Sequence, residues 1–386
     1  MASGNAQSSE CDQILVQDKQ SVKAIIMNRP KQLNALSDYM ISRMLERFLA
    51  YEEDPYVKLV LLKGKGRAFC AGGDVSAVVR DISKAGDWRL GASFFQKEFI
   101  LNYVMATYKK PQVSILHGIV MGGGAGASLH GRFRIVTENT VFAMPETALG
   151  LFPDVGASYF LSRLPGFFGE YVGLTGTRLD GGEMLACGLA THFVHSTKLS
   201  LLEEELCEAN LDDQSNICKI FDKYAEQPVL KENSAFRKLH IVDKCFSHRT
   251  VEEIFSALEK ENENAEINGD WISAAIDSLK RASPTSLKIS LKSIREGRLQ
   301  GVGQCLIREF RMVCHVLRGE VSRDFFEGCR AILIDRDRNP KWSPSRLDLV
   351  SDEMVNHYFS KVNDEGWMDL KLPTKSNLPP LAMAKL

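Results

Sequence analysis

The sequence predicts an α/β fold with a helical C-terminal part, and three observations support this prediction. Short apolar runs alternate with segments of helical periodicity over the first half of the chain, which favours stacked βα units over a separate all-β domain. From about residue 180 onward, helical periodicity dominates and strand signals are few. Two glycine-rich turns, at 63–74 and 122–126, each follow an apolar run, as ligand-binding turns do in α/β proteins.

The first segments of the chain are expected to form three strands and one helix. Residues 14–16 and 22–27 are rich in β-formers and are separated by QDKQS, which predicts an opening hairpin. Ser37 is placed to cap a helix, because apolar residues recur after it at helical spacing. A buried strand is expected over 57–62, and the glycine-rich loop KGKGRAFCAGGD follows it.

The next segments continue the alternation and then become helical. A helix is expected over 92–108, a strand over 113–117 and a helix over about 122–130. Two further strands are expected near 132–136 and 140–143. Helices are then expected at LDGGEMLACGLA, at LSLLEEELCEANL and over 250–262, 271–281, 285–297 and 301–318, whereas the polar stretch 213–235 is expected to be a connection.

These signals divide the chain into four parts. Residues 1–11 are expected to be a disordered N-terminus, and 12–210 an α/β core that carries the active site. Residues 211–365 are expected to form a helical C-terminal region that closes this site. The remaining residues, 366–386, are expected to be a flexible tail.

Composition excludes several classes of partner. The 48 basic and 49 acidic side chains give a formal charge of −1, so no global field favours nucleic acid or a membrane surface. No apolar run approaches the roughly 18 residues that span a bilayer. The nine cysteines include no CxxC pair, which indicates reduced thiols rather than a disulfide framework or a zinc site.

The two ends of the chain differ in their targeting signals. The N-terminal MASGNAQSSE has neither a secretory nor a mitochondrial pattern. The last three residues, Ala384, Lys385 and Leu386, repeat the small, basic, leucine form of the peroxisomal SKL signal. They predict a peroxisomal location and an import receptor as a partner.

The stretch 113–158 is the predicted centre of the chemistry. An apolar run ends at His117 and Gly118 and is soon followed by three consecutive glycines, which can bring backbone N–H groups close to a ligand. If a helix starts there, these groups lie at its positive end and form half of an oxyanion hole. Glu146 and Asp154 follow in the turns MPETALG and LFPDVG, which suggests general-base or nucleophilic work.

The same residues allow other interpretations. The glycines also fit G-x-G-x-x-A, but a dinucleotide motif belongs to a first βα turn and more than 100 residues precede this one. There is no G-x-S-x-G elbow, and His192 and His195 lack further metal ligands at suitable spacing. His117 and His130 are expected to be structural. Purely structural roles are the alternatives. Asp154 could cap a helix, and Glu146 could stabilise its turn. Glu98 could be an exposed helix position, and the loop 63–74 could be a surface hairpin.

Four motifs in order resemble the crotonase (enoyl-CoA hydratase/isomerase) superfamily: NRPKQLNAL, GRAFCAGGD, HGIVMGGGAGAS and MPETALGLFPDVG. The resemblance implies a spiral of ββα units with a C-terminal helical layer, and an acyl-CoA as the substrate. It implies that the backbone N–H groups of Gly73 and Gly123 hold the thioester oxygen. Residues implied in CoA binding are Arg29, Lys31, Leu33, Ala71 and Gly72.

One departure from the family pattern indicates the reaction. Hydratases of this family carry a catalytic glutamate where this chain has Gly126, so the chain resembles the 3-hydroxyisobutyryl-CoA hydrolase branch, as REFRMVCHVLRGEVSRDFFEGC also does. The resemblance implies that Glu146 is the nucleophile or general base, that Asp154 orients water or the substrate hydroxyl, and that Glu98 helps to bind that hydroxyl.

The expected reaction is hydrolysis of 3-hydroxyisobutyryl-CoA, as in valine breakdown, and 3-hydroxypropionyl-CoA is a candidate second substrate. CoA is then part of the substrate, and neither a separate cofactor nor a metal is expected. The alternatives are an enoyl-CoA hydratase or isomerase of the same fold and a catalytically silent acyl-CoA binder. The sequence leaves the oligomeric state open.

Overall fold

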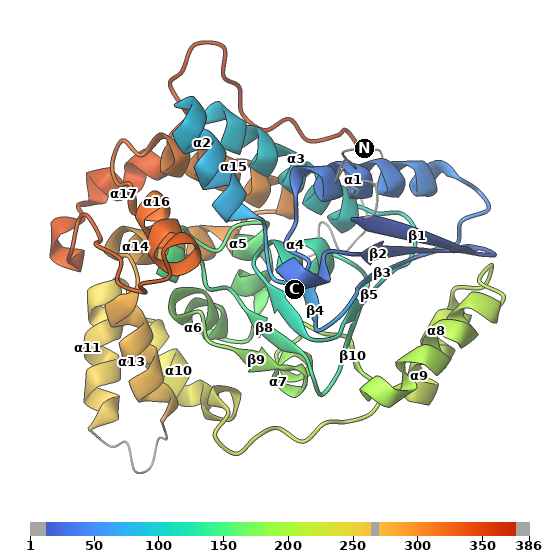
Figure 1. The fold of residues 1–386 in the computed structure, drawn as a ribbon. Helices are drawn as coiled ribbons and strands as arrows, with labels where there is room; N and C mark the ends of the chain where they lie inside the picture. Colours follow the sequence, from blue (N-terminus) through green and yellow to red (C-terminus); the bar gives the residue numbers. More distant parts are fainter. Residues whose placement is uncertain (1–12, 264–269, 376–386) are drawn as a thin grey trace, which may run out of the picture.

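Two β-sheets form the centre of the protein (Figure 1). The computed structural model describes residues 13–263 and 270–375, so the predicted N-terminal segment 1–11 and the tripeptide 384–386 lie outside the described residues. The larger sheet has the order β1-β2-β3-β5-β7-β10 and the smaller one β4-β6-β8-β9. The strands are β1 (Ile14–Lys19), β2 (Val22–Met27), β3 (Leu59–Gly64), β4 (Ala68–Cys70), β5 (Gln112–Leu116), β6 (Ile119–Met121), β7 (Phe133–Val136), β8 (Val141–Ala143), β9 (Leu179–Asp180) and β10 (His192–Phe193).

Helices surround both sheets. Those of the N-terminal half are α1 (Asp38–Glu53), α2 (Val75–Ala85), α3 (Arg89–Ala106), α4 (Gly123–Leu129), the 3-10 turn η3 (Glu146–Leu149), α5 (Ala157–Phe160), α6 (Phe168–Thr175), α7 (Gly181–Ala186) and α8 (Leu199–Glu208). Those of the C-terminal half are α9 (Ser215–Tyr224), α10 (Leu239–Phe246), α11 (Val251–Asn262), α13 (Trp271–Arg281), α14 (Pro284–Gly297), α15 (Val302–Arg318), α16 (Asp324–Cys329), the π-helical turn η7 (Arg330–Ile334) and α17 (Asp352–Phe359).

The chain builds the two sheets in repeated turns. β3, β5 and β7 lie parallel in the larger sheet, and the strand that follows each of them, β4, β6 or β8, lies in the smaller sheet. The first two of these strand pairs are followed directly by helices: α2 and α3 after β4, and α4 after β6. This repeat is the predicted spiral of ββα units, and it stacks the two glycine turns beside each other.

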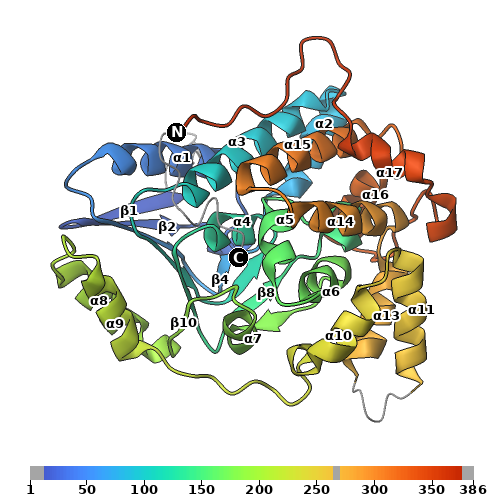
Figure 2. The same cartoon turned by 180° about the vertical axis from the view of Figure 1, so that it is seen from behind.

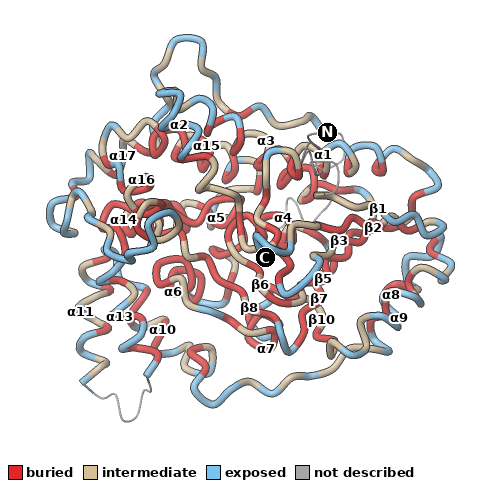
Figure 3. The backbone as a smooth tube through the Cα atoms, in the orientation of Figure 1, coloured by how far each residue is buried: buried red, intermediate tan, exposed pale blue. Residues whose placement is uncertain are grey.

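Strands β2, β3, β5 and β7 of the larger sheet are mostly buried, whereas the edge strand β1 is not (Figure 3). Side chains alternate along a strand, so Ile25 and Met27 join the main core while Val22 and Ala24 face the other side. That other side is covered by α8 and α9, through apolar residues such as Phe221. The two-sided burial explains why these strands are almost continuously apolar.

The C-terminal helices pack on the core at two places. α15 runs along α3, and α14 packs on α5 and α6 (Figure 2). Helices α10, α11 and α13 gather beside α6, at the opposite end of the molecule from α8 and α9 (Figures 1 and 2). The helical layer predicted from the sequence is therefore confirmed, and its contact with α3 and α5 matters for the site described below.

One local expectation was wrong, and one alternative interpretation is excluded. The stretch 213–235 contains helix α9, because Ile217, Ile220 and Phe221 recur at helical spacing and are buried. Helix α9 packs against α8, the helix that precedes it in the chain. The loop 63–74 is not a surface hairpin, since its residues 68–70 form the buried strand β4.

Two global expectations can be compared with the described residues. The eight cysteines among them are all free thiols. None of the helices in 13–263 and 270–375 combines the length and apolar character that crossing a bilayer requires.

Candidate active site

A cavity of about 440 Å³ collects residues from both glycine turns, α3, η3 and η7. Nearly all residues predicted for the site line it. They are Lys31, Leu33, Ala71, Gly72, Gly73, Glu98, Gly123, Glu146 and Asp154. The remaining predicted residue, Arg29, does not.

Gly73 presents its backbone through a short strand-like pairing. Leu36 pairs with Gly73 in a parallel bridge, in which Leu36 N donates to Gly72 O (2.8 Å) and Asp74 N donates to Leu36 O (2.9 Å). Because backbone groups alternate in direction along an extended segment, the N–H of Gly73 points away from this pairing. It is therefore available to a ligand.

Gly123 is the first residue of α4, so its N–H belongs to the first turn of the helix. The first four N–H groups of a helix have no partner within it, and they carry the positive end of its dipole. The preceding Gly122 has a φ of 47° and turns the chain into the helix, a conformation that favours glycine. α4 follows β6 directly, so the turn sits at a strand end.

The two glycine backbones are in close contact. A Cβ added to Gly123 would lie 2.9 Å from the Gly73 nitrogen and 2.3 Å from Glu98 Oε1. A Cβ added to Gly72 would lie 3.8 Å from the Gly123 nitrogen. The structure thus brings both amides to one wall of one cavity, and Gly123 must lack a side chain to keep that space open.

Glu146 begins η3 directly after Pro145 and is 5% exposed. Its carboxyl group reaches the glycine turn, because a Cβ on Gly122 would meet Glu146 Oε1 at 2.7 Å. Its other oxygen, Oε2, is buried and has no hydrogen-bond partner in the structure. A buried acceptor without a partner is costly, and it is expected where a substrate completes the site.

Glu98 lies on α3 and is 1% exposed, so its interpretation as an exposed helix position was wrong. Phe95 and Phe99 of the same helix are also buried. Its Oε1 atom also lacks a hydrogen-bond partner and faces Gly123. Glu98 thus contributes a second unpaired acceptor to the cavity.

Asp154 is 4% exposed and lies between η3 and α5. The alternative role of a helix cap was wrong: the N-cap of α5 is Gly156, and no side chain caps this helix. The side chain of Asp154 lines the cavity instead. Three carboxyl groups from three separate segments therefore surround the same space.

Burial sets the proton affinity of these carboxyl groups. It raises the pKa of Glu98 to about 8 and that of Glu146 to about 8, with a further increase in Glu146 from the charge of Glu98. Burial, followed by the charges of Glu98, Glu146 and Glu309, raises the pKa of Asp154 well above its usual range. The three carboxyl groups therefore bind protons more readily than exposed carboxyl groups do, as residues of acid–base sites commonly do.

We expect Glu98→Gln to stabilise the ligand-free protein at alkaline pH. Between the unfolded pKa near 4.3 and the folded pKa of about 8, the folded protein binds more protons, so wild-type stability falls as pH rises through this window. Glutamine avoids this loss. Thermal unfolding should show a melting temperature raised by about 3 °C at pH 8.5 and unchanged at pH 5. Equal shifts at both pH values would contradict the buried-charge explanation.

The structure also accounts for Gly126. A Cβ at this position would lie 2.5 Å from Val155 Cβ and 3.0 Å from Asn102 Nδ2. Val155 thus fills the space beside α4 that a side chain at 126 would need. No second acid can be placed there without displacing Val155 from its buried position.

The structure gives Arg29 a different task from the predicted one. Its guanidinium donates to Ala35 O (2.6 Å) and to Asp74 Oδ2 (3.1 Å), so it ties two loops together behind the cavity. The conformation of this segment depends on Asn34, which is buried with a φ of 56° and donates to Lys65 O and Ala68 O. The structural role of Asn34 was missed because no local pattern in the sequence indicates its contacts with Lys65 and Ala68.

Among the cavity residues that sequence reasoning missed, Leu333 and Arg336 come from the C-terminal half of the chain. Leu333 belongs to η7 and Arg336 follows it by two residues, so both lie far along the chain from the glycine turns. Three cationic side chains line the cavity wall: Lys31, Arg67 and Arg336. The only hint in the sequence was the basic character of the stretch around 330–338, which carries no position signal.

None of the eight histidines lines the cavity. His130 donates from Nε2 to Val155 O (2.8 Å), and burial lowers its pKa to about 4, so it is neutral and structural. His117 Nδ1 contacts Thr137 Oγ1 at 3.1 Å. Among the described residues, His315, Glu320 and His357 each place one potential metal-ligand atom within 4.8 Å of the others. None of these three residues lines the cavity.

Comparisons with known proteins agree with this geometry. The family model for enoyl-CoA hydratase/isomerase matches residues 22–359. The chain is 69% identical to 3-hydroxyisobutyryl-CoA hydrolase 1 of Arabidopsis thaliana, over 97% of this chain and 98% of that protein. It is 66% identical to probable 3-hydroxyisobutyryl-CoA hydrolase 2 of the same plant, over 96% and 98%. The solved structure of a carnitinyl-CoA dehydratase from Mycobacterium thermoresistibile superposes with a TM-score of 0.82 at 34% identity, covering 92% of this chain and all of that one.

With two glycine turns, a ββα spiral and a family match over most of its length, the chain belongs to the enoyl-CoA hydratase/isomerase, or crotonase, family. Within that family, its high-identity relatives carry the name 3-hydroxyisobutyryl-CoA hydrolase. The predicted family and fold are thereby confirmed.

Proposed function

We propose that this protein hydrolyses the thioester of 3-hydroxyisobutyryl-CoA to 3-hydroxyisobutyrate and CoA, a step of valine breakdown. The observation that carries the proposal is the meeting of the Gly73 and Gly123 backbones with the Glu146 carboxyl group in one cavity. The names of relatives at 65–69% identity support the choice of substrate. 3-Hydroxypropionyl-CoA, with the same hydroxyl position, is a candidate second substrate.

The reaction needs a place for a developing negative charge. When an oxygen nucleophile adds to the thioester carbon, the carbonyl oxygen becomes an oxyanion, and each well-placed amide donor stabilises it by about 3 kcal/mol. Gly73 and Gly123 would supply these two donors. The carbon–sulfur bond then breaks, and the CoA thiolate leaves and takes up a proton. If water is the nucleophile, its oxygen stays in the carboxylic acid. If Glu146 is the nucleophile, the acyl group is left on its carboxylate as an anhydride, and a water molecule then cleaves the anhydride to free the acid and restore Glu146.

Glu146 would start this reaction in one of two ways. As a carboxylate it can attack the carbonyl and form a mixed anhydride that water then hydrolyses, or it can take a proton from an attacking water. Both routes need the ionised form. Since burial raises the pKa of Glu146 to about 8, kcat/KM should increase with pH up to that region.

Glu98 and Asp154 would recognise the 3-hydroxyl group and order the water. Glu98 Oε1 is buried without a partner, so a substrate hydroxyl would satisfy it. A site with unpaired buried acceptors discriminates strongly against an analogue that lacks the hydroxyl. We therefore propose a preference for 3-hydroxyacyl-CoA over plain acyl-CoA.

Two alternatives predict different assays. A hydratase or isomerase of this fold is disfavoured because Gly126 offers no acid and Val155 occupies the adjoining space. A silent binder would bind acyl-CoA without turnover. Purified protein should release CoA from 3-hydroxyisobutyryl-CoA, detected with a thiol reagent, and leave the absorbance of crotonyl-CoA unchanged. Loss of the crotonyl double bond without CoA release would favour the hydratase, and binding alone would favour the silent binder.

We expect Arg336→Ala to raise KM for the CoA substrate about tenfold, because charge-assisted hydrogen bonds to phosphate are strong. The value of kcat should stay near that of the wild type, because a cation that binds the phosphates of CoA does not act at the thioester carbon. Arg338→Ala is the matched control: this arginine also has a positive φ but does not line the cavity. Equal effects of both changes on KM would contradict a specific role.

We further propose that Ala384, Lys385 and Leu386 bind a peroxisomal import receptor. The support is the match of these three residues to the SKL form. A fluorescent protein fused ahead of the full chain should enter peroxisomes, and deletion of the three residues should leave it in the cytosol. Import of the truncated fusion in cells without other copies of the protein would contradict the proposal.

A further inference from the structure

The turn that carries Asp154 is strained. Val155 has a φ of 56° and Gly156 a φ of 83°. A β-branched residue rarely adopts positive φ, and such a conformation persists only where the surroundings enforce it. In this protein the strain has a visible result: it turns the Asp154 side chain to the cavity and the Val155 side chain into the space beside Gly126.

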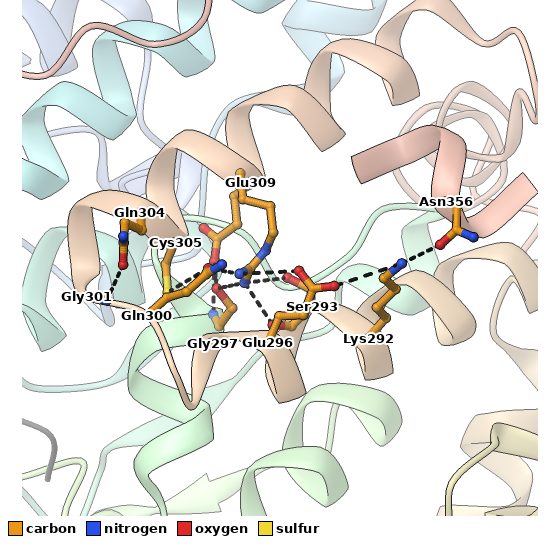
Figure 4. A network of polar contacts seen from close by, with 12 residues as sticks. Lys292, Ser293, Glu296, Gly297, Gln300, Gly301, Gln304, Cys305, Glu309 and Asn356 are labelled. Carbon is orange, nitrogen blue, oxygen red and sulfur yellow. Dashed lines mark hydrogen bonds and ion pairs between the residues drawn. The ribbon is translucent and has the colours of Figure 1, made fainter. Parts of the chain in front are cut away.

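Glu309 holds this turn from the C-terminal helical layer. It is fully buried in the middle of α15. Its carboxylate accepts hydrogen bonds from Gly156 N (2.6 Å) through Oε2, and from Ser158 N (2.9 Å) and the Ser158 hydroxyl through Oε1. Figure 4 shows Glu309 on its helix within the polar network that also contains Ser293, Glu296 and Gln300.

Neighbouring groups fix the carboxylate in turn. Arg308 donates to the Ser158 hydroxyl (2.8 Å) and to Ser293 O on α14 (2.8 Å). On the opposite side of the turn, His130 donates to Val155 O (2.8 Å). The two carboxylate oxygens of Glu309 accept three hydrogen bonds from one turn. A glutamine side chain has one acceptor oxygen and could not accept all three, so the turn requires the carboxylate.

We propose that Glu309 is a positioning residue for thioester hydrolysis: it holds the strained turn so that Asp154 faces the cavity and Val155 fills the place beside Gly126. This inference rests on the proposed function. Glu309 does not line the cavity, so it acts through the turn and not on the substrate. Its helix also packs on α3, which carries Glu98, so α15 contacts the supports of two of the three carboxyl groups.

Glu309→Gln tests this assignment. Glutamine keeps the size but replaces one acceptor oxygen with an NH₂ group, which would face a donor of the turn. A small misplacement of Asp154 should lower kcat about a hundredfold. KM and CoA affinity should stay within about threefold of wild type, because the cationic wall of Lys31, Arg67 and Arg336 belongs to other segments. A role in stability alone would not lower kcat selectively in the folded enzyme.

Glu296→Gln is the matched control, since Glu296 lies in the same polar network, 3.7 Å from Arg308, but does not contact the turn (Figure 4). Its kcat should equal that of the wild type. A folded Glu309→Gln enzyme with wild-type kcat, or with kcat and CoA affinity lowered together, would overturn the proposal. If that variant does not fold, Ser158→Ala decides: loss of one donor should lower kcat about threefold at constant KM, and unchanged kcat overturns the proposal.

The wild-type assay separates this inference from the proposed function. If the wild-type enzyme releases no CoA from 3-hydroxyisobutyryl-CoA, the proposed function fails. If it does and Glu309→Gln is equally fast, only the positioning role fails.

Discussion

Replacing Glu146 with glutamine is expected to lower the rate of CoA release about a thousandfold. The amide cannot attack the thioester carbon or accept a proton from water, yet it has nearly the size of the acid it replaces. CoA affinity should stay within about threefold, because Glu146 acts at the reacting carbon and the cationic residues of the cavity wall are unchanged.

The measurement is single-turnover CoA release together with calorimetric binding of CoA. Glu138→Gln is a suitable control, since Glu138 is an exposed carboxylate bonded to Ser196 and lies outside the cavity. It should keep the wild-type rate. Substantial turnover by Glu146→Gln would remove Glu146 from the mechanism, whatever its burial.

Gly123→Ala is expected to cost between about a hundredfold and a thousandfold in kcat, the effect of losing one oxyanion donor. The added methyl group would lie 2.9 Å from the Gly73 nitrogen and 2.3 Å from Glu98 Oε1. Both distances are too short, so the methyl group takes the space in which the thioester oxygen has to approach the two amides.

Gly301→Ala is the control, because a Cβ there meets nothing within 4 Å and Gly301 lies outside the cavity, at the N-cap before α15. Circular dichroism should show that both variants fold. Gly123→Ala with wild-type kcat would mean that the two glycine backbones do not form the oxyanion site.

The parts of the site that local patterns encode were predictable from the sequence. The apolar run before the glycines predicted β5, the glycine triplet predicted the start of α4, and the family motifs placed Gly73 and Glu146 in one site. Each of these features depends on neighbours in the chain, so its signal is contained in a short stretch of residues.

Features that depend on distant partners were not predictable. The family resemblance implied a substrate-binding role for Glu98, but no local pattern distinguished it from a solvent-facing helix residue; the packing of α1 and α15 on α3 buries it. Glu309 and Asp154 are more than 150 residues apart and meet through a turn whose positive φ no sequence signal marks. Arg29 carried a plausible charge for CoA, but Asp74 and Ala35 engage it instead.

The central claim is that the Gly73 and Gly123 amides bind one acyl oxygen beside Glu146. Glu146→Gln provides a slow enzyme in which 3-hydroxyisobutyryl-CoA can be trapped, and a crystal structure of that complex tests the claim most directly. We predict the thioester oxygen within about 3 Å of both nitrogens, with residue 146 next to the carbonyl carbon. A thioester oxygen bound to neither amide, or an acyl group on the far side of the cavity from residue 146, would contradict it.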